Sequence, residues 1–286
     1  MNRRKKKSKA WGGLALIILV ILSVVIWRLV VGLGEGGRVV FVNNDQVEVR
    51  QLSVEQGRGV RVNLPAHLMV PVKGMQGELR LKSMIKFAED ESKPFNIVRR
   101  STEILLGTQV DGVIYQSEDL DLWKIIYRRS DMGVIQRLTW WWQWSRLEKN
   151  KVQEIDWPSS LGEEKERPDG TKIIEVSRNE AWDFSHEYLG TGRLRNESVG
   201  VKVVNASGWQ GLSYLATSML EVEGAVVVDL LAQDKQDGLC KVSYQQENSV
   251  VDWIVSKWGC KREKSEVDDV VVTLKEKWGE RYQREM

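Results

Sequence analysis

A stretch of apolar residues from Trp11 to Leu33, directly behind a basic tract, constrains this chain more than any other feature. Its first part, Trp11 to Trp27, carries no charge and is about 17 residues long, enough for a helix to cross the hydrocarbon core of a bilayer. Arg28 can extend its guanidinium to the interface, which lengthens the span. The basic residues precede the span and Glu35 is the first acidic residue after it, so the N-terminus is expected in the cytoplasm. The sequence therefore predicts a cytoplasmic tail at 1–10, a single transmembrane helix at 11–33, and the rest of the chain outside the cytoplasm.

Two other interpretations of this region fit the residues less well. A cleaved signal peptide has a shorter apolar middle, of roughly 7–15 residues, followed by a small-x-small cleavage site. The candidate here, Val31-Gly32-Leu33, matches that pattern poorly. A nucleic-acid-binding patch would also be basic, but the membrane span already accounts for the position of these charges.

The residues beyond the span have the composition of a folded protein. The chain holds 42 basic and 40 acidic residues, and much of the basic surplus lies in the N-terminal tract. The exported part therefore gives no reason to expect nucleic acid as a partner. Hydrophobic residues make up 42% of the chain, with 13 Trp, which is typical of packed domains and not of disorder.

The two cysteines, Cys240 and Cys260, both lie in the part predicted to be outside the cytoplasm, where disulfides persist. A disulfide between them is expected, with two buried free thiols as the alternative. The two histidines, His67 and His186, are distant in sequence, and no CxxC or HxxxH spacing is present. We therefore expect no metal site and no cofactor.

The residues from 38 to 157 predict a mixed α/β domain. Alternating or continuous β-forming residues predict strands, which lie at 38–50 (as a hairpin), 59–64, 110–115 and 152–157. The 3.6-residue rhythm of apolar positions, or helix-start and helix-stop residues, predict helices at 79–89, 94–106 and 120–127.

A cluster of tryptophans, Trp140-Trp141-Trp142-Gln143-Trp144, suggests a platform that stacks on carbohydrate or dips into a membrane. On a helix, however, Leu138, Trp141, Trp142, Ser145 and Leu147 share one face. Most of these rings are therefore expected in the core or against the bilayer surface near the anchor.

The segment 158–196 is predicted to be a linker with short elements. Residues 158–170 are polar and rich in turn formers, 171–176 could form an edge strand, and 181–189 is aromatic without a clean period. A boundary is expected near Asn196.

The pattern of residues 197–280 predicts a small βαββαβ sandwich, with one sheet and two helices packed against it. The strands are expected at 201–204, 225–231 (buried), 240–244 and 269–274, and the helices at 212–222 and 250–258. Cys240 then opens a strand and Cys260 follows a helix, so their side chains can approach. A disulfide there closes a loop of about twenty residues, for which chain-entropy estimates give roughly 3 kcal/mol. The whole chain is thus of the α/β (α+β) class.

The turn between the first strand and helix of this region is a possible binding turn. It reads Asn205-Ala-Ser-Gly-Trp-Gln-Gly211 and leads from a strand into a helix, as phosphate-binding loops do. It lacks the GxGxxG and GK[ST] patterns, and its glycines also suit a tight turn. Its candidate residues are Asn205, Ser207, Gly208 and Gly211.

The C-terminal pattern resembles the LytR C-terminal domain family. The likeness is carried by VGVKVVNASGWQGLSYLATSMLEVEGAVVVDLL and by DDVVVTLKEKWG, over roughly Glu197 to Gly279. Members of that family begin with a valine-rich strand, an Asn-x-Ser/Thr-Gly turn and a Gly-Leu helix start. The family's terminal Leu-Gly is replaced here by Leu274-Lys275.

The region before it resembles a reduced LytR-CpsA-Psr domain, on the motifs VRVNLPAHLMVPV (60–72) and STEILLGTQVDGVIYQ (101–116). In that family the first motif reads Ile-Pro-Arg-Asp, and its Arg and Asp hold a pyrophosphate and a metal. Here Pro65 is kept but Ala66 and His67 occupy the charged positions, while Asp111 matches a position that is architectural in the family. The family's later Asp-x-x-Arg-x-x-Arg-Gln segment has no counterpart.

The resemblance implies a cell-envelope role, and the altered motif decides which one is expected. Transfer of a lipid-pyrophosphate-linked polymer needs cations and a metal to offset the charge of the departing pyrophosphate. The leading hypothesis is therefore a non-catalytic, membrane-anchored protein that binds cell-wall polymer or an envelope protein, with no catalytic residue. The alternatives are a divergent glycopolymer phosphotransferase and a scaffold without affinity for glycans.

Overall fold

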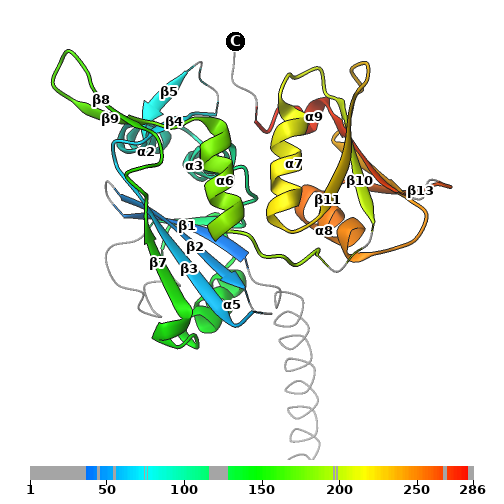
Figure 1. Ribbon diagram of the computed structural model, residues 1–286, viewed down its shortest axis with the longest axis horizontal. Coiled ribbons are helices and arrows are strands. Elements are labelled where there is room, and N and C mark those ends of the chain that lie inside the picture. Colours follow the sequence, from blue (N-terminus) through cyan, green and yellow to red (C-terminus); the bar gives the residue numbers. More distant parts are fainter. Residues whose placement is uncertain are drawn as a thin grey trace, which may run out of the picture.

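The fold is known from a computed structural model that describes residues 37–282, apart from 44–45, 54–55, 74, 76, 116–127, 196, 198 and 267–268. The predicted tail at 1–10, the transmembrane helix at 11–33 and the short helix at 120–127 lie outside the described residues. Within the described ranges, no helix is both long and apolar enough to cross a bilayer. The chain is a mixed α/β protein whose two halves each contain a five-stranded mixed sheet (Figure 1).

The first sheet has the strand order β6-β1-β2-β3-β7. The predicted hairpin is confirmed as β1 (Gly37–Asn43) and β2 (Gln46–Ser53), and β3 (Arg58–Leu64) continues it in antiparallel pairing. The outer strands β6 (Gly112–Tyr115) and β7 (Val152–Asp156) pair in parallel with β1 and β3.

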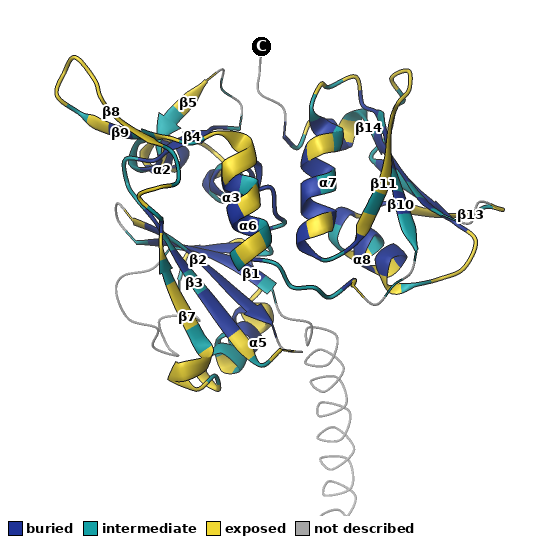
Figure 2. Ribbon diagram, in the orientation of Figure 1, coloured by how far each residue is buried: buried dark blue, intermediate teal, exposed yellow. Residues whose placement is uncertain are grey.

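Strand β1 is buried on both faces, which explains its uninterrupted apolar run. Val40 and Val42 face a core formed with α2 (Leu81–Asp90), α3 (Pro94–Leu106) and α6 (Arg178–Tyr188), whereas Val39 and Phe41 face α5 (Val134–Ser145). Helices therefore cover both faces of β1, whose five inner residues are all buried (Figure 2).

Helix α5 has some of its tryptophan rings in the core, as expected, and others outside it. Its inward positions are Arg137, Trp140 and, in part, Trp144, where the rings of Trp140 and Trp144 stack 5.1 Å apart. Trp142, predicted to share the buried or bilayer-facing side, is 41% exposed. Leu147, predicted on the same face as Trp142, follows the helix and lies beside Trp144 against Gly59 of the sheet. The spacing alone cannot tell which face of the helix meets the sheet.

The segment 158–196 contains more regular structure than expected. Residues Glu163–Glu166, predicted to be loop, form strand β8, which pairs with β9 (Lys172–Glu175). The strand has no apolar residue, so its signal is absent from hydrophobic periodicity and lies in cross-strand ion pairs such as Lys172–Glu164 at 2.9 Å. A second pair of short strands, β4 (Met69–Pro71) and β5 (Glu78–Arg80), lies nearby (Figure 1).

Helix α6 also belongs to this segment and packs into the core of the first half through Ala181, Phe184 and the following Leu189. Its N-terminus is fixed by a capping box between Ser177 and Glu180. The boundary near Asn196 stays a prediction.

The second sheet has the order β11-β10-β14-β12-β13. Its elements are β10 (Gly200–Ala206), α7 (Leu212–Val222), β11 (Val226–Ala232), β12 (Cys240–Tyr244), α8 (Ser249–Trp258), β13 (Lys261–Lys264), β14 (Val270–Lys275) and α9 (Glu276–Gly279). Both long helices share one core with the sheet, as predicted.

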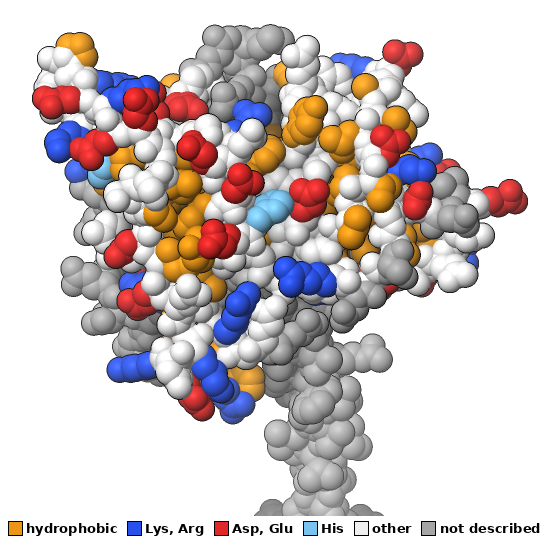
Figure 3. All heavy atoms as spheres, in the orientation of Figure 1, with side chains coloured by type: hydrophobic (Ala, Val, Ile, Leu, Met, Phe, Trp, Pro, Cys, Tyr) orange, Lys and Arg blue, Asp and Glu red, His pale blue; other side chains and the backbone are white. Residues whose placement is uncertain are grey.

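Two details of the second half differ from the βαββαβ prediction. The unpredicted strand β13, whose four residues are all charged, makes β12-α8-β13 a parallel unit like β10-α7-β11, and β14 joins the two units. The strand predicted to be buried, β11, is an edge strand in which Val226 is 59% and Val228 is 52% exposed. Figure 3 shows apolar side chains gathered on this part of the surface. An apolar run does not reveal that its strand lies at an edge.

The predicted disulfide between Cys240 and Cys260 is present, with the two Cα atoms 4.7 Å apart. Cys240 begins β12 and Cys260 follows α8, and both residues are buried. The bond therefore ties the end of a helix to the start of the adjacent strand, inside the core of the second half.

Candidate functional site

The two halves of the chain meet along α6 and α7, and a cavity of about 610 Å³ opens between them. The first half contributes residues from α3 and α6, and the second half contributes the turn before α7 and the C-terminal residues. The lining residues are Ile104, Arg178 and Trp182 from the first half, and Ser207–Leu212, Leu215, Lys235, Gly279 and Tyr282 from the second. We call this cavity the inter-half cleft.

The turn that forms one wall of the cleft is held by its own side chains. The Asn205 side-chain amide donates to the carbonyl of Trp209 at 2.7 Å, and the Asn205 carboxamide oxygen accepts from the Ser207 hydroxyl at 2.6 Å. Ser207 Oγ in turn accepts from the Trp209 backbone N–H at 3.0 Å. These bonds fix the turn, and Gly211, at φ 77°, then leads into α7 without a side-chain cap. The backbone is therefore rigid where it borders the cleft.

Two indole rings face the cleft from opposite halves. Trp182 is half-buried on α6 and donates its Nε1–H to the carbonyl of Ile104 at 3.2 Å. Trp209 is also half-buried, at the tip of the turn, and lies against Gly279, where an added Cβ would come 2.3 Å from its ring. Each ring is thus packed partly on protein and partly exposed where it lines the cleft.

Two cations belong to the same lining. The guanidinium of Arg178 lies 5.7 Å from the ring centre of Trp182. Lys235 is paired with Glu276 at 2.5 Å, and this hydrogen bond raises the pKa of the lysine. Among the described lining residues there is no carboxylate, histidine or cysteine. The described lining therefore combines aromatic rings with cations, a set that can bind rings and anions.

A buried polar cluster that joins the halves borders the cleft through Tyr282. Arg100 donates to Glu103 at 2.5 Å and to the Tyr282 hydroxyl at 3.0 Å. Burial, followed by the nearby Glu103, raises the pKa of Tyr282 well above its usual range, so this hydroxyl stays neutral. Burial alone would lower the pKa of Arg100, but the charge of Glu103 and the contact with Tyr282 outweigh it and raise that pKa.

The predicted binding turn reaches the cleft in part. Ser207, Gly208 and Gly211 line it, whereas Asn205 supports the turn from behind. The sequence interpretation missed Arg178, Trp182, Trp209 and Lys235. The capping box is a sequence signal for the start of α6, the helix that carries Arg178 and Trp182. No local signal shows that α6 faces a turn from the other half.

The positions of the altered motif lie elsewhere. Pro65 and Ala66 border a second pocket of about 460 Å³, which also contains Arg50 and Arg61. The arginines there are already paired: Arg61 contacts Glu48 at 2.8 Å, and Arg50 contacts the same carboxylate. A phosphate entering this pocket would have to displace these internal partners.

The remaining predicted positions are structural in their contacts. His67, the last position of the altered motif, accepts a hydrogen bond from the Ile174 N–H through its backbone carbonyl at 3.1 Å. Asp111 accepts from the Arg38 N–H at 2.9 Å and contacts Lys257 of the second half at 2.5 Å. In the described part of the chain, no group of three or more His, Cys, Asp or Glu residues could hold a metal ion.

The sequence matches no protein-family model, and no curated protein matches it. Solved structures of LytR-CpsA-Psr proteins are similar over about 55% of the chain. They include B. subtilis TagV (TM-score 0.42, 8% identity, 55% of this chain and 98% of that chain) and TagT bound to LIIa-WTA (TM-score 0.42, 8%, 55% and 90%). A third is YwtF (TagT), a LytR-CPS2A-psr family protein with bound octaprenyl pyrophosphate lipid (TM-score 0.41, 10%, 55% and 90%). Similarity at this level assigns the chain to no family and no activity.

Proposed function

We propose that this chain is a non-catalytic, membrane-anchored cell-envelope protein that binds an anionic cell-wall glycopolymer in the inter-half cleft. The observation that carries the proposal is the lining of that cleft, which brings two indole rings and two cations together without a carboxylate among its described residues. The anchor is the apolar span at 11–33, with the N-terminus in the cytoplasm and the domains at 38–157 and 197–280 outside.

The chemistry of the cleft matches that of a glycan with acidic groups. Indole rings stack on the apolar faces of sugar rings, as Trp182 and Trp209 could from opposite walls. Arg178 would offset phosphate or carboxylate groups along the same polymer with a planar pair of donors. Lys235 would contribute by exchanging its partner Glu276 for such a group. A cleft that is open to solvent accepts a long chain along its length, which a closed pocket would not.

Two further observations support the location and the organisation. The Cys240–Cys260 disulfide is the kind of bond that persists outside the cytoplasm. The second half carries the residues that resemble the LytR C-terminal domain family, and its turn at Asn205–Gly211 forms a wall of the cleft. We assign the polymer-binding role to both halves together, because neither contributes a complete set of rings and cations.

The proposal is tested by measuring binding of the purified full chain, in detergent, to a polyol-phosphate polymer of the teichoic acid type. The variants Arg178→Gln and Trp209→Leu should each weaken binding at least about tenfold, which corresponds to ~1.4 kcal/mol. Lys261→Gln is the matched control, because it removes an exposed cation from β13, which does not line the cleft. A neutral glycan of similar length should bind more weakly than the anionic one.

Two outcomes would contradict polymer binding in the cleft. Equal loss of affinity in Arg178→Gln and Lys261→Gln would indicate non-specific charge attraction. Absence of polymer binding, with capture of one envelope protein that Trp209→Leu abolishes, would favour a protein partner or scaffold role.

A phosphotransferase remains the second candidate, because Arg50 and Arg61 converge beside Pro65 and Ala66 with the carboxylates of Glu48 and Asp156 in the same pocket. This candidate requires that the full chain transfers a glycan from a lipid-linked pyrophosphate donor to an acceptor, and that Arg61→Gln abolishes the transfer. No transfer by the unaltered chain, at a concentration at which polymer binding saturates, would exclude it.

A further inference from the structure

We propose that helix α5 lies flat on the outer surface of an anionic lipid bilayer, with Val134, Ile135 and Trp142 in contact with lipid. The inference rests on the membrane anchor of the proposed function, but not on polymer binding in the inter-half cleft. It assigns a role to the tryptophan-rich stretch, which the cleft does not use.

The outward face of α5 is apolar. Val134 is 45%, Ile135 is 51% and Trp142 is 41% exposed, although each is a large hydrophobic residue. With the half-buried Leu138 and Trp141 they recur at helical spacing, so they form one stripe along the helix. The opposite side of α5 is already used, because Trp140 packs on Phe41 of the first sheet. The stripe is therefore an apolar face left over after the helix has met its own core.

The stripe has a basic border of the kind that anionic lipid attracts. The guanidinium of Arg146 lies 3.6 Å from the ring centre of Trp142, which places a cation directly over an exposed indole. Apart from the buried Arg137, residues 128–151 hold five basic and two acidic residues, namely Arg128, Arg129, Arg146, Lys149 and Lys151 against Asp131 and Glu148. Indole rings with neighbouring cations are typical of the lipid–water interface.

One end of α5 lies where the chain enters the first sheet. Gly37, the first residue of β1, pairs with Leu52, and Leu52 pairs with Gly59. At Gly59 an added Cβ would come 2.8 Å from Leu147 and 3.0 Å from Trp144. The C-terminal end of α5 therefore covers the same row of the sheet as Gly37.

The N-terminal end of α5 also lies near the start of β1. Val39, two residues after Gly37, pairs with Gly112, and at Gly112 an added Cβ would meet the side chain of Met132. Helix α5 begins at Val134, directly after Met132 and Gly133. The helix thus lies across the sheet at the end where β1 begins.

The length of chain before Gly37 identifies the surface that α5 meets. The predicted span ends at Leu33, and the four residues from there to Gly37 reach at most about 14 Å when fully extended. Gly37 must then lie close to the bilayer, and so must α5. A single partner, the lipid surface, therefore accounts for the exposed apolar stripe, for the basic residues beside it and for the position of α5.

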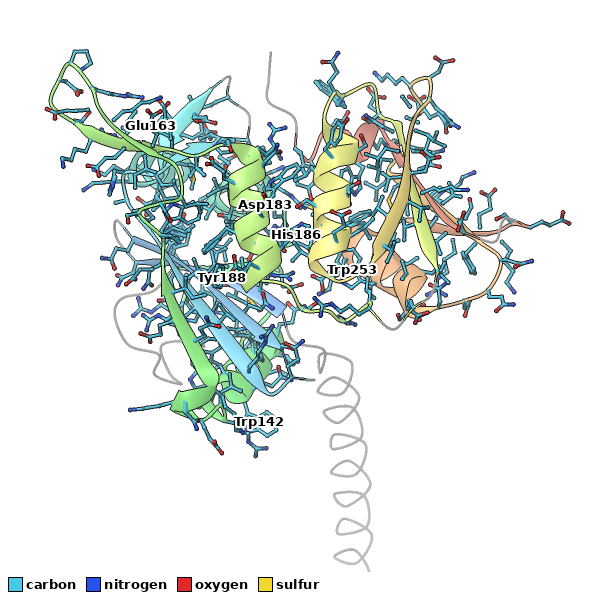
Figure 4. All side chains as sticks on the ribbon, in the orientation of Figure 1. Trp142, Glu163, Asp183, His186, Tyr188 and Trp253 are labelled. Carbon is cyan, nitrogen blue, oxygen red and sulfur yellow. A yellow bond between two sulfur atoms is a disulfide. The ribbon has the colours of Figure 1, made fainter. Side chains whose placement is uncertain are left out.

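The test measures the depth of α5 in vesicles that contain the full chain. Ile135→Cys is labelled with an environment-sensitive fluorophore; the native cysteines do not react because they form the disulfide. Glu163→Cys is the control, since Glu163 is exposed on β8, at the opposite end of the first half from Trp142 (Figure 4). In phosphatidylcholine–phosphatidylglycerol vesicles that carry spin-labelled lipid, quenching at position 135 should exceed that at position 163 by at least about twofold.

The lipid composition of the vesicles tests whether the basic border of α5 binds anionic lipid. Flotation of the chain with the vesicles separates this inference from the proposed function. Replacing phosphatidylglycerol with phosphatidylcholine should reduce quenching at position 135 and leave position 163 unchanged. Equal quenching at the two positions, in chain that floats with the vesicles, would overturn the role of α5 and leave the anchor and the cleft standing. Chain that does not float with vesicles would overturn the anchor and this inference together, whereas polymer binding in detergent would be unaffected.

Discussion

At the scale of single residues, Arg38 shows how a charge can be buried between two halves of a chain. The residue is 3% exposed, and its guanidinium donates to Glu223 at 2.5 Å, to the Leu189 carbonyl at 2.5 Å and to Gln51 at 3.1 Å. Glu223, also buried, accepts a second bond from the Thr191 hydroxyl at 2.7 Å. Because the charges are paired and hydrogen-bonded, the cost of taking them out of water is offset.

Removing one charge of this pair should be far more harmful than removing one at the surface. Glu223→Gln leaves Arg38 buried without a counter-charge, and we expect the free energy of unfolding to fall by about 3 kcal/mol. Glu175→Gln is the matched control, because its partner Lys165 is exposed and such pairs contribute little. Urea unfolding of both variants measures the difference, and equal midpoints would contradict it.

The disulfide gives a second prediction at this scale. The free energy of unfolding of the double variant Cys240→Ala/Cys260→Ala should be about 3 kcal/mol lower. The reason is that a loop of about twenty residues is no longer closed in the unfolded chain. Reductant should lower the thermal midpoint of the unaltered chain and have no effect on the double variant. A midpoint in the unaltered chain that reductant does not change would show that the bond contributes nothing to stability.

At the scale of elements, the C-terminus of α3 depends on a glycine for two separate reasons. Gly107 has φ 60°, a conformation that side chains disfavour, and an added Cβ would come 2.3 Å from Ser218 Oγ and 2.6 Å from Trp182. Gly57 has nearly the same backbone, φ 57°, with nothing within 4 Å of an added Cβ. The two positions therefore separate backbone strain from crowding.

Gly57→Ala should lower the free energy of unfolding by about 1 kcal/mol, the strain of a left-handed alanine. Gly107→Ala should lower it by a further ~1–3 kcal/mol, because it also overpacks the contact between α3, α6 and α7. Chemical unfolding of both variants gives the comparison. Equal effects would mean that Ser218 and Trp182 move aside without cost.

Elements with strong local signals could be predicted from the sequence. Strands β1 to β3 alternate or are continuously apolar, α3 begins with Pro94 and ends at Gly107, and both long helices of the second half have clear apolar faces. Strand β8 and the exposure of β11 could not be predicted, because the first depends on cross-strand charges and the second on which strand has no neighbour. Of the cleft, only the turn could be predicted from the sequence. The other wall comes from α6, which is distant from the turn in sequence and meets it only in the folded chain.

At the scale of the whole molecule, the two halves are joined by three polar bridges, of which only the one to Tyr282 borders the inter-half cleft. Arg38 contacts Glu223, Asp111 contacts Lys257, and Arg100 contacts Tyr282, so each bridge has one residue in each half. The hydrophobic cores are otherwise separate, apart from Ile104 of α3 and Trp182 of α6, which pack on the core of the second half. The bridges therefore set the distance between the walls that carry Trp182 and Trp209.

The polar bridges predict that the two halves unfold together, and that polymer binding in the cleft needs the bridges intact. The unaltered chain should give one calorimetric transition for the folded region, because unfolding either half would leave buried charges of the other without partners. The triple variant Asp111→Asn/Glu223→Gln/Tyr282→Phe should give two transitions, since both cores remain while the bridges between them are weakened. It should also bind polymer more weakly than the unaltered chain, although Arg178, Trp182 and Trp209 are intact, because the walls are no longer held at one spacing. Two transitions in the unaltered chain, or full polymer affinity in a triple variant whose transitions have separated, would show that the bridges do not hold the cleft.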